Sequence, residues 1–268
     1  MIARVTLYIW ICFLWLFNTH SFGQVEKSPK LQKVTILVDD SYPPYSYLSD
    51  GSLYGIYVDL VKQAAYLLRD TYKIDLQPVP WKRGVAALEQ GEAFALMPPY
   101  IHMKKRPFIW PYSIALQEEV VVAFCNKGFT LIDVLSRAVT DPPINVGLNA
   151  GFMILDEALM EAQKRGKIKV WENKNTKANI LKLGKKRIDC YINDRLSTLI
   201  GINNMKRSHP DIDTGNFLED KTILRRTAHI GYLKEENDKF PFKNDFINKM
   251  DDALSTILER QEDGVGLE

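Results

Sequence analysis

The chain has 268 residues, of which 46% are hydrophobic and 25% charged, and its 35 basic and 33 acidic side chains leave a formal net charge of +2. This near balance provides no basic footprint for nucleic acid, so we expect no nucleic-acid partner. Behind the N-terminal leader described next, about 245 residues remain, which is enough for one large domain or two small ones.

Residues 1–23 have the pattern of an export signal. Arg4 supplies a positive start, an apolar core runs from Val5 to Phe17, and Ser21–Gly23 offers a cleavage site. The apolar core falls short of the ~20 residues that span a bilayer, so an uncleaved anchor is the weaker alternative. We predict a signal peptide that is removed on export.

The following segment alternates strands and helices. A β-branched run at Val34–Val38 predicts a strand, and apolar residues at helical spacing from Ile56 to Leu68 predict a helix. Residues 74–78 and 93–97 read as further strands, separated by a helix over 81–90 that Gly91 stops. This order predicts one α/β unit.

A second unit of the same kind follows. Residues 118–125 predict a strand that crosses into it, and Thr130 with Asp133 three residues later predicts a capped helix. Strands over 144–148, 167–171 and 188–193 alternate with helices over 154–164, over 177–183 and after Asp194. After the polar residues 203–222, we expect a strand over 228–233 and an amphipathic helix over 245–258.

Four segments carry a resemblance to a known family. The first holds Asp39, Tyr42, the Pro44–Tyr45 turn and the stretch Gly55–Leu60, which reads Gly-x-x-x-Asp-Leu. Three others follow in the same order: residues 79–91, residues 146–151 with the pattern Val-Gly-x-x-x-Gly, and residues 188–194 with an Asp near each end. Together they resemble the bacterial periplasmic solute-binding proteins of family three, the amino-acid type.

The resemblance implies an α/β, two-lobed periplasmic-binding-protein fold of type II. Each lobe would be a mostly parallel sheet flanked by helices, and two crossover segments would join the lobes. It places lobe 1 at residues 24–116, lobe 2 at residues 117–222 and a return to lobe 1 at residues 223–268. A ligand between the lobes would stabilise the closed form by hinge motion.

The resemblance also assigns residues to a ligand site: Asp39, Tyr42, Trp81, Arg106, Gly151, Phe152 and Asp194. Arg106 would bind a ligand carboxylate, because a guanidinium matches a carboxylate with two parallel hydrogen bonds. Asp194 would receive the ligand's ammonium group. Aromatic rings, those of Tyr42 and Trp81 with Tyr45 and Trp110, would enclose its apolar part.

Each of these roles has a structural alternative. Arg106 ends the basic run Lys104–Arg106, and such a run is often a solvated face. Asp194 has the position of an N-cap for the helix after it, and it can hold both roles. Trp81 opens a helix, where a tryptophan commonly packs in the core or at the rim.

Two stretches depart from the family's polar pattern. Pro98, Pro99, Ile101 and Met103 stand where small polar residues are common, and Phe152–Met153 replaces a Ser/Thr pair. The site is therefore expected to be more apolar and bulkier than an amino-acid site usually is. The identity of the ligand stays open.

Cys125 and Cys190 remain after removal of the leader. The resemblance would place their strands side by side and antiparallel, and the periplasm permits disulfides. Two buried free thiols are the alternative.

The sequence favours a binding protein over an enzyme. It has no HExxH, CxxC, Gly-rich phosphate loop or Gly-x-Ser-x-Gly elbow, and its four histidines are scattered singly. We expect no catalytic residues, no metal and no cofactor. The resemblance implies a monomeric periplasmic receptor for a small zwitterion or carboxylate that delivers it to an inner-membrane ABC permease. A ligand sensor without a transporter and a dehydratase-like enzyme on the same fold are the alternatives.

Overall fold

The computed structural model describes residues 31–138, 140–234 and 239–263. Every element below belongs to one compact unit that begins at Gln32. The predicted signal peptide lies outside the described residues. Within them, no helix is long and apolar enough to cross a membrane.

The first sheet has the order β5–β1–β6–β13–β7. Its strands are β5 (Tyr72–Val79), β1 (Gln32–Asp39), β6 (Ala95–Met97), β13 (Gly231–Leu233) and β7 (Ile109–Tyr112). β1 is parallel to β5 and β6, whereas β13 is antiparallel to β6 and β7. The small sheet β2 (Ser41–Tyr42), β3 (Ser46–Ser49) and β4 (Ser52–Tyr54) follows β1 along the chain.

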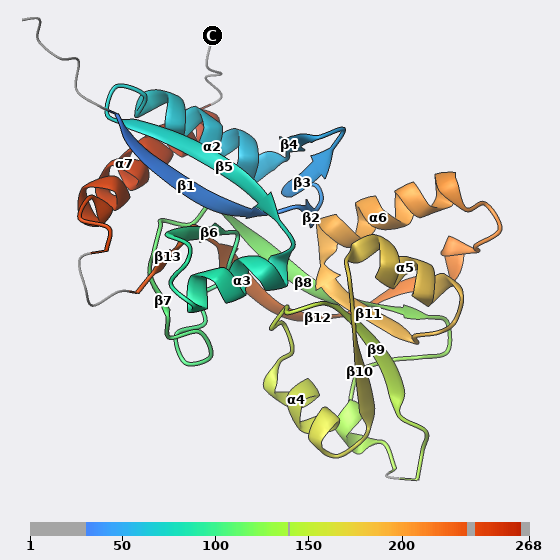
Figure 1. The fold of residues 1–268 in the computed structure, drawn as a ribbon. Helices are drawn as coiled ribbons and strands as arrows, with labels where there is room; N and C mark the ends of the chain where they lie inside the picture. Colours follow the sequence, from blue (N-terminus) through green and yellow to red (C-terminus); the bar gives the residue numbers. More distant parts are fainter. Residues whose placement is uncertain (1–30, 139, 235–238, 264–268) are drawn as a thin grey trace, which may run out of the picture. The chain divides into compact units, whose positions relative to one another are not determined.

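Helices cover both faces of β1. Ile36 packs in one core cluster with α2 (Ile56–Leu67) and α7 (Lys243–Glu262), while Leu37 packs in another with α3 (Trp81–Glu89). Successive side chains of a strand point to opposite faces, so both faces of β1 are buried. Figure 1 shows α2 and α7 together beside β1 and β5. The strand's apolar run follows from this double coverage.

The second sheet has the order β10–β9–β11–β8–β12. Its strands are β10 (Ile168–Asn173), β9 (Ile144–Asn149), β11 (Cys190–Asp194), β8 (Gln117–Asn126) and β12 (Phe217–Ala228), and its helices are α4 (Glu157–Lys164), α5 (Thr176–Gly184) and α6 (Arg195–Ser208). Val121 of β8 packs in the cluster that holds α4, and Val122 packs in the cluster that holds α5 and α6. The 3-10 turns η1 (Val134–Ser136) and η2 (Thr214–Asn216) lie in the connections.

Two adjacent segments join the sheets. The chain leaves the first sheet between β7 and β8 and returns between β12 and β13. These segments are held together by the bonds from Ser113 N to Ile230 O and from Leu116 N to Ala228 O, both 2.8 Å. We call the elements around the first sheet lobe 1 and those around the second sheet lobe 2. The residue limits of the lobes stay a prediction, and β12 runs across the predicted boundary at residue 222.

Two sequence-based expectations about elements are wrong. The helix expected from Thr130 is absent, because Asp133 has a left-handed backbone (φ 50°) and only the short η1 follows it. The sequence predicts a polar connection up to residue 222, whereas strand β12 begins at Phe217. It lies at the sheet edge, where charged side chains are common, and two register shifts interrupt its alternation.

Cys125 of β8 and Cys190 of β11 are direct partners in the antiparallel register and form a disulfide. Both residues are buried. The bond ties two central strands of the second sheet.

Candidate functional site

A small cavity lies where strand ends of the two lobes meet. Asp39 at the end of β1, Trp81 at the start of α3 and residues of the loop after β6 line it from lobe 1, and Phe152, Met153 and Ile154 after β9 line it from lobe 2. The carboxyl ends of parallel strands are where open α/β sheets bind ligands. The cavity volume is about 30 Å³, which is room for one or two waters.

Five of the seven predicted ligand residues line this cavity: Asp39, Tyr42, Trp81, Arg106 and Phe152. Gly151 contacts two of them from the neighbouring turn. Asp194 is not among the lining residues. The structure therefore brings six of the seven residues together at one place.

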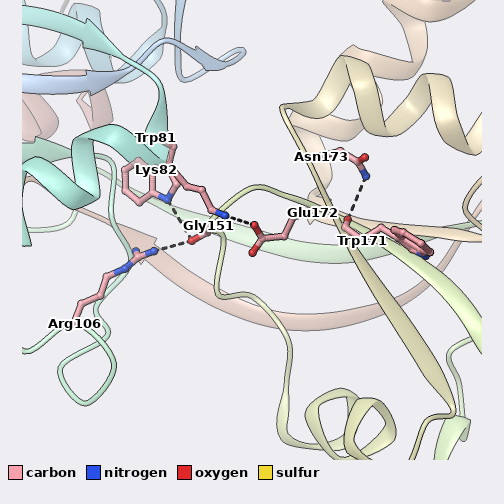
Figure 2. A network of polar contacts seen from close by, with 7 residues as sticks. All are labelled: Trp81, Lys82, Arg106, Gly151, Trp171, Glu172 and Asn173. Atoms are coloured by element: carbon pink, nitrogen blue, oxygen red, sulfur yellow. Dashed lines mark hydrogen bonds and ion pairs between the residues drawn. The ribbon is translucent and has the colours of Figure 1, made fainter.

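Arg106 links the two lobes, as Figure 2 shows. Its Nη2 donates to the carbonyl oxygen of Gly151 over 2.7 Å, and the indole N–H of Trp81 points to the same oxygen at 3.4 Å. The Arg106 side chain is buried, and its Nε has no hydrogen-bond partner among the described residues. Burial lowers the pKa of Arg106 from its ordinary value. An unpartnered buried guanidinium donor favours an anionic ligand group.

Gly151 is required by the geometry of this contact. Its backbone is left-handed (φ 82°), and a Cβ there would lie 2.9 Å from Cγ of Lys82 and 3.3 Å from Cδ1 of Trp81. Lys82 in turn forms a 2.5 Å ion pair with Glu172 at the end of β10, a second contact between the lobes.

Asp39 supplies a buried carboxyl group to the cavity. It is 3% exposed, and one of its oxygens accepts the backbone N–H of Ser41 over 3.0 Å. Burial raises the pKa of Asp39 to about 7; the Ser41 hydrogen bond opposes this rise and the charge of Asp40 adds to it. A cationic ligand group beside Asp39 would favour the ionised carboxylate.

Aromatic rings form much of the remaining wall. The ring of Phe152 meets that of Tyr42 edge to face at 5.5 Å and that of Trp81 at 6.0 Å. Tyr100, from the loop after β6, also lines the cavity. Trp110 is 47% exposed and does not line the cavity, and neither does Tyr45.

Glu119 is a buried acidic residue that no sequence motif indicates. It lies on β8, just after the crossing from lobe 1. Its carboxylate accepts hydrogen bonds from the hydroxyls of Tyr42, Tyr57 (2.6 Å) and Tyr100 (2.5 Å). Burial and the nearby charge of Asp194 raise the pKa of Glu119 to about 7, although the tyrosine donors oppose the rise. Its position follows from strand alternation, since it shares a strand face with the core residues Val121 and Ala123.

Asp194 caps α6. Its Oδ1 accepts the backbone N–H of Ser197 over 2.8 Å and the hydroxyl of Tyr45 over 2.9 Å. Burial raises the pKa of Asp194. The N-cap alternative is thus realised, and the ammonium role of Asp194 stays a prediction.

His102 stands at the edge of the cavity. Burial lowers its pKa to about 4, and the cations Arg106, Lys105 and Arg226 add to this effect. The imidazole is therefore neutral at neutral pH. The described residues contain no group of three or more His, Cys, Asp or Glu side chains that could hold a metal ion.

Solved structures share this fold. An ancestral arginine-binding protein bound to arginine is 19% identical to this chain, with a TM-score of 0.64. The match covers 87% of this chain and 94% of the ancestral protein. A histidine kinase sensor domain with similarity to periplasmic binding proteins is 12% identical (87% and 92% covered, TM-score 0.66). The ancestral amino acid-binding protein AncCDT-1, a precursor of cyclohexadienyl dehydratase, is 16% identical (87% and 91%, TM-score 0.61). At these identities the likeness shows the two-lobed fold alone.

No curated protein sequence matches the chain. A family model described as bacterial extracellular solute-binding proteins, family 3, matches residues 34–262, which is most of the sequence. The chain therefore belongs to the bacterial extracellular solute-binding proteins of family 3.

Proposed function

We propose that this protein is an exported periplasmic receptor for a small zwitterionic solute. One observation carries the proposal: Arg106 and Asp39, two nearly fully buried groups of opposite charge, line one aromatic cavity to which both lobes contribute. Arg106 binds the ligand carboxylate through its guanidinium fork, and Asp39 faces the cationic group. Tyr42, Trp81 and Phe152 enclose the part between them.

Ligand entry requires the lobes to separate. A cavity of about 30 Å³ cannot contain an amino acid. Three side chains of lobe 1 also contact lobe 2, because Arg106 and Trp81 meet the Gly151 carbonyl and Lys82 pairs with Glu172. The paired crossing segments at Ser113–Ile230 and Leu116–Ala228 are the hinge in this proposal. Ligand binding then stabilises the closed form because the ligand contacts both lobes.

The receptor's output is delivery of its solute to an inner-membrane ABC permease. Detection without transport is the second candidate, and it is favoured by the likeness to a histidine kinase sensor domain. Co-purification of the mature protein with membrane proteins from its own host distinguishes the two, since recovery of a permease supports transport and recovery of a kinase supports sensing.

An enzymatic role is a further alternative. Asp39, whose pKa is near 7, has the protonation behaviour of an acid-base catalyst, and one protein with this fold is a precursor of a dehydratase. Turnover of prephenate-like acids by the purified protein, lost in Asp39→Asn, would replace the receptor proposal.

A thermal-shift screen tests the receptor proposal. The mature protein is screened against amino acids, small dicarboxylates, polyamines and peptides, and a ligand at 100 times its Kd adds about 2.7 kcal/mol of stability. We expect a shift with a zwitterion that Arg106→Ala and Asp39→Asn both abolish. Lys104→Ala is the matched control, because Lys104 is an exposed cation on the same loop and does not line the cavity. A thermal shift that is unchanged in both Arg106→Ala and Asp39→Asn would contradict the proposed site.

A further inference from the structure

The tyrosine hydroxyls of the cavity wall form hydrogen bonds on the side that faces away from the cavity. Tyr42 and Tyr100 both line it, yet both donate their hydroxyl hydrogens to the carboxylate of Glu119 behind the wall. Glu119 is 1% exposed and does not line the cavity. The two tyrosines therefore offer ring carbons to a ligand.

The rings come from four separate places in the fold. Tyr42 belongs to β2, Trp81 to α3, Tyr100 to the loop after β6, and Phe152 to the turn after β9. The edge-to-face packing of Phe152 against Tyr42 and Trp81 fixes their mutual orientation. An aromatic cavity of this kind, with a buried carboxyl group at its wall, suits a cation.

One ring already holds a cation. The guanidinium carbon of Arg106 lies 5.4 Å from the ring centroid of Trp81, within the range of a cation–π contact. Glu119 accepts hydrogen bonds from the hydroxyls of Tyr42 and Tyr100, and its ionised form adds negative charge behind these two rings. These contacts with Glu119 increase the attraction of the Tyr42 and Tyr100 rings for positive charge.

The cavity offers few side-chain acceptors for N–H groups. A primary ammonium carries three N–H donors, and Ser, Thr, Asn and Gln are absent from the lining residues. Asp39 and the neutral His102 are the side chains with free acceptors there. A buried N–H without an acceptor costs binding energy, whereas a fully alkylated nitrogen needs no acceptor and packs against rings.

We propose that the ligand is a betaine: a small carboxylate whose cationic nitrogen is fully alkylated and is enclosed by the rings of Tyr42, Trp81, Tyr100 and Phe152. Asp39 supplies the counter-charge without having to accept a hydrogen bond. This inference rests on the proposed function, because it keeps Arg106 as the carboxylate ligand and specifies the other end of the zwitterion.

Matched pairs of probes test the inference. The mature wild-type protein is titrated calorimetrically with glycine and trimethylglycine, and with L-proline and its N,N-dimethyl betaine. We expect each betaine to bind at least tenfold more tightly than its parent amino acid. If the parent amino acids bind as well or better and depend on Arg106, the betaine inference is overturned and the receptor proposal stands. If none of the four binds, the betaine inference is overturned, and the wider screen decides the receptor proposal.

Three tryptophan variants separate the aromatic cage from general packing. Trp81→Leu should weaken binding of the betaine at least tenfold, Trp81→Phe should restore most of it, and Trp110→Leu should have no effect because Trp110 is exposed outside the cavity. Trp81→Phe tests the ring itself, since it loses the indole bond to Gly151 just as Trp81→Leu does. Equal weakening in Trp81→Leu and Trp81→Phe would overturn the role assigned to the ring.

Discussion

Arg106 donates a hydrogen bond to the carbonyl oxygen of Gly151 over 2.7 Å, and this bond joins the loop after β6 in lobe 1 to the turn after β9 in lobe 2. The same guanidinium has a buried Nε without a partner among the described residues. In the proposed function, ligand binding and lobe contact therefore depend on one side chain. A carboxylate bound to the remaining donors would strengthen the contact between the lobes.

Gly151→Ala should weaken ligand binding at least tenfold. The added Cβ would lie 2.9 Å from Lys82 and 3.3 Å from Trp81, so the turn cannot approach lobe 1 as closely. The variant also places alanine in a left-handed conformation, which costs roughly 1–2 kcal/mol of folding stability. Calorimetric titration and urea unfolding measure the two effects.

Gly166→Ala is the control for this variant. Gly166 is also left-handed (φ 70°), but a Cβ there has no neighbour within 4 Å. It should lose similar stability and keep wild-type affinity. Equal affinity in the two variants would contradict the role of the Gly151 turn in binding.

The stability of the ligand-free protein should fall between pH 6.5 and pH 8. Burial raises the pKa of Asp39 and of Glu119 to about 7, whereas unfolded carboxyl groups titrate near pH 4. The folded state thus binds more protons than the unfolded state, and its stability is lost as the pH rises through about 7. The expected loss is roughly 1 kcal/mol per group across this window. His102 and His229 act in the opposite direction at the acid end of this window, because burial lowers the pKa of both below the unfolded value near 6.5.

Urea unfolding of Glu119→Gln at several pH values checks this slope. The variant should lose about half of the pH dependence, since one of the two titrating groups is gone. Glu118→Gln is the matched control, because Glu118 is the exposed neighbour on the same strand. A wild-type slope in Glu119→Gln would show that the pKa of Glu119 is not raised.

Affinity for a cationic ligand should rise with pH over the same range. Asp39 must be ionised to supply a counter-charge, and its pKa of about 7 leaves a large fraction protonated at pH 6. Titrations at pH 6 and pH 8 measure the effect, and Asp39→Asn should bind weakly at both. The same pH dependence in Asp39→Asn would assign it to another group.

Tyr42→Phe and Tyr57→Phe should differ in binding but not much in stability. Each removes one hydroxyl that donates to Glu119, which costs about 1.5–3 kcal/mol for a bond to a charged acceptor. The hydroxyl of Tyr42 fixes a ring that lines the cavity against Glu119, whereas the Tyr57 ring does not line it. Only Tyr42→Phe therefore leaves a cavity ring less firmly held, and only that variant should change the affinity measurably. Chemical denaturation and titration of both variants check this, and a larger affinity loss in Tyr57→Phe would contradict it.

Replacing both cysteines by serine should destabilise the protein and leave ligand affinity unchanged. The disulfide closes a loop with a sequence separation of 65, for which loss of the cross-link costs about 4 kcal/mol in the chain-entropy model. Neither cysteine lines the cavity. Urea unfolding with and without reductant measures the change, and reductant should have no effect on the double variant.

Local patterns predicted most of the fold. The apolar run of β1 and the helical spacing of α2 follow directly from burial, and the order of elements was enough to indicate two lobes. β12 escaped because an edge strand with two register shifts lacks a clear alternation. The prediction of a helix at Thr130 was wrong because a local cap pattern does not reveal distant partners. The Thr130 hydroxyl and the backbone N–H of Leu131 both donate to Asp220, which lies 90 and 89 residues away in sequence.

The placement of two candidate ligand residues at one cavity was predictable. The resemblance assigned Asp39 and Arg106 to a common site and both line the cavity, while their roles in binding stay a prediction. Glu119 was not predicted because its hydrogen-bond donors are three tyrosines that lie 77, 62 and 19 residues away in sequence. Asp194 matched a motif position, but the local geometry uses its carboxylate for a cap and for Tyr45.

The most direct test of the proposed site compares one zwitterion with its methyl ester. The zwitterion that gives the largest shift in the screen and its ester are titrated against wild type and Arg106→Ala. Esterification should weaken binding to wild type by roughly 10- to 100-fold, the range for a charged hydrogen bond, and should have little further effect in Arg106→Ala. Equal losses on esterification in both proteins would show that Arg106 does not bind the carboxylate, and the proposed site would be wrong.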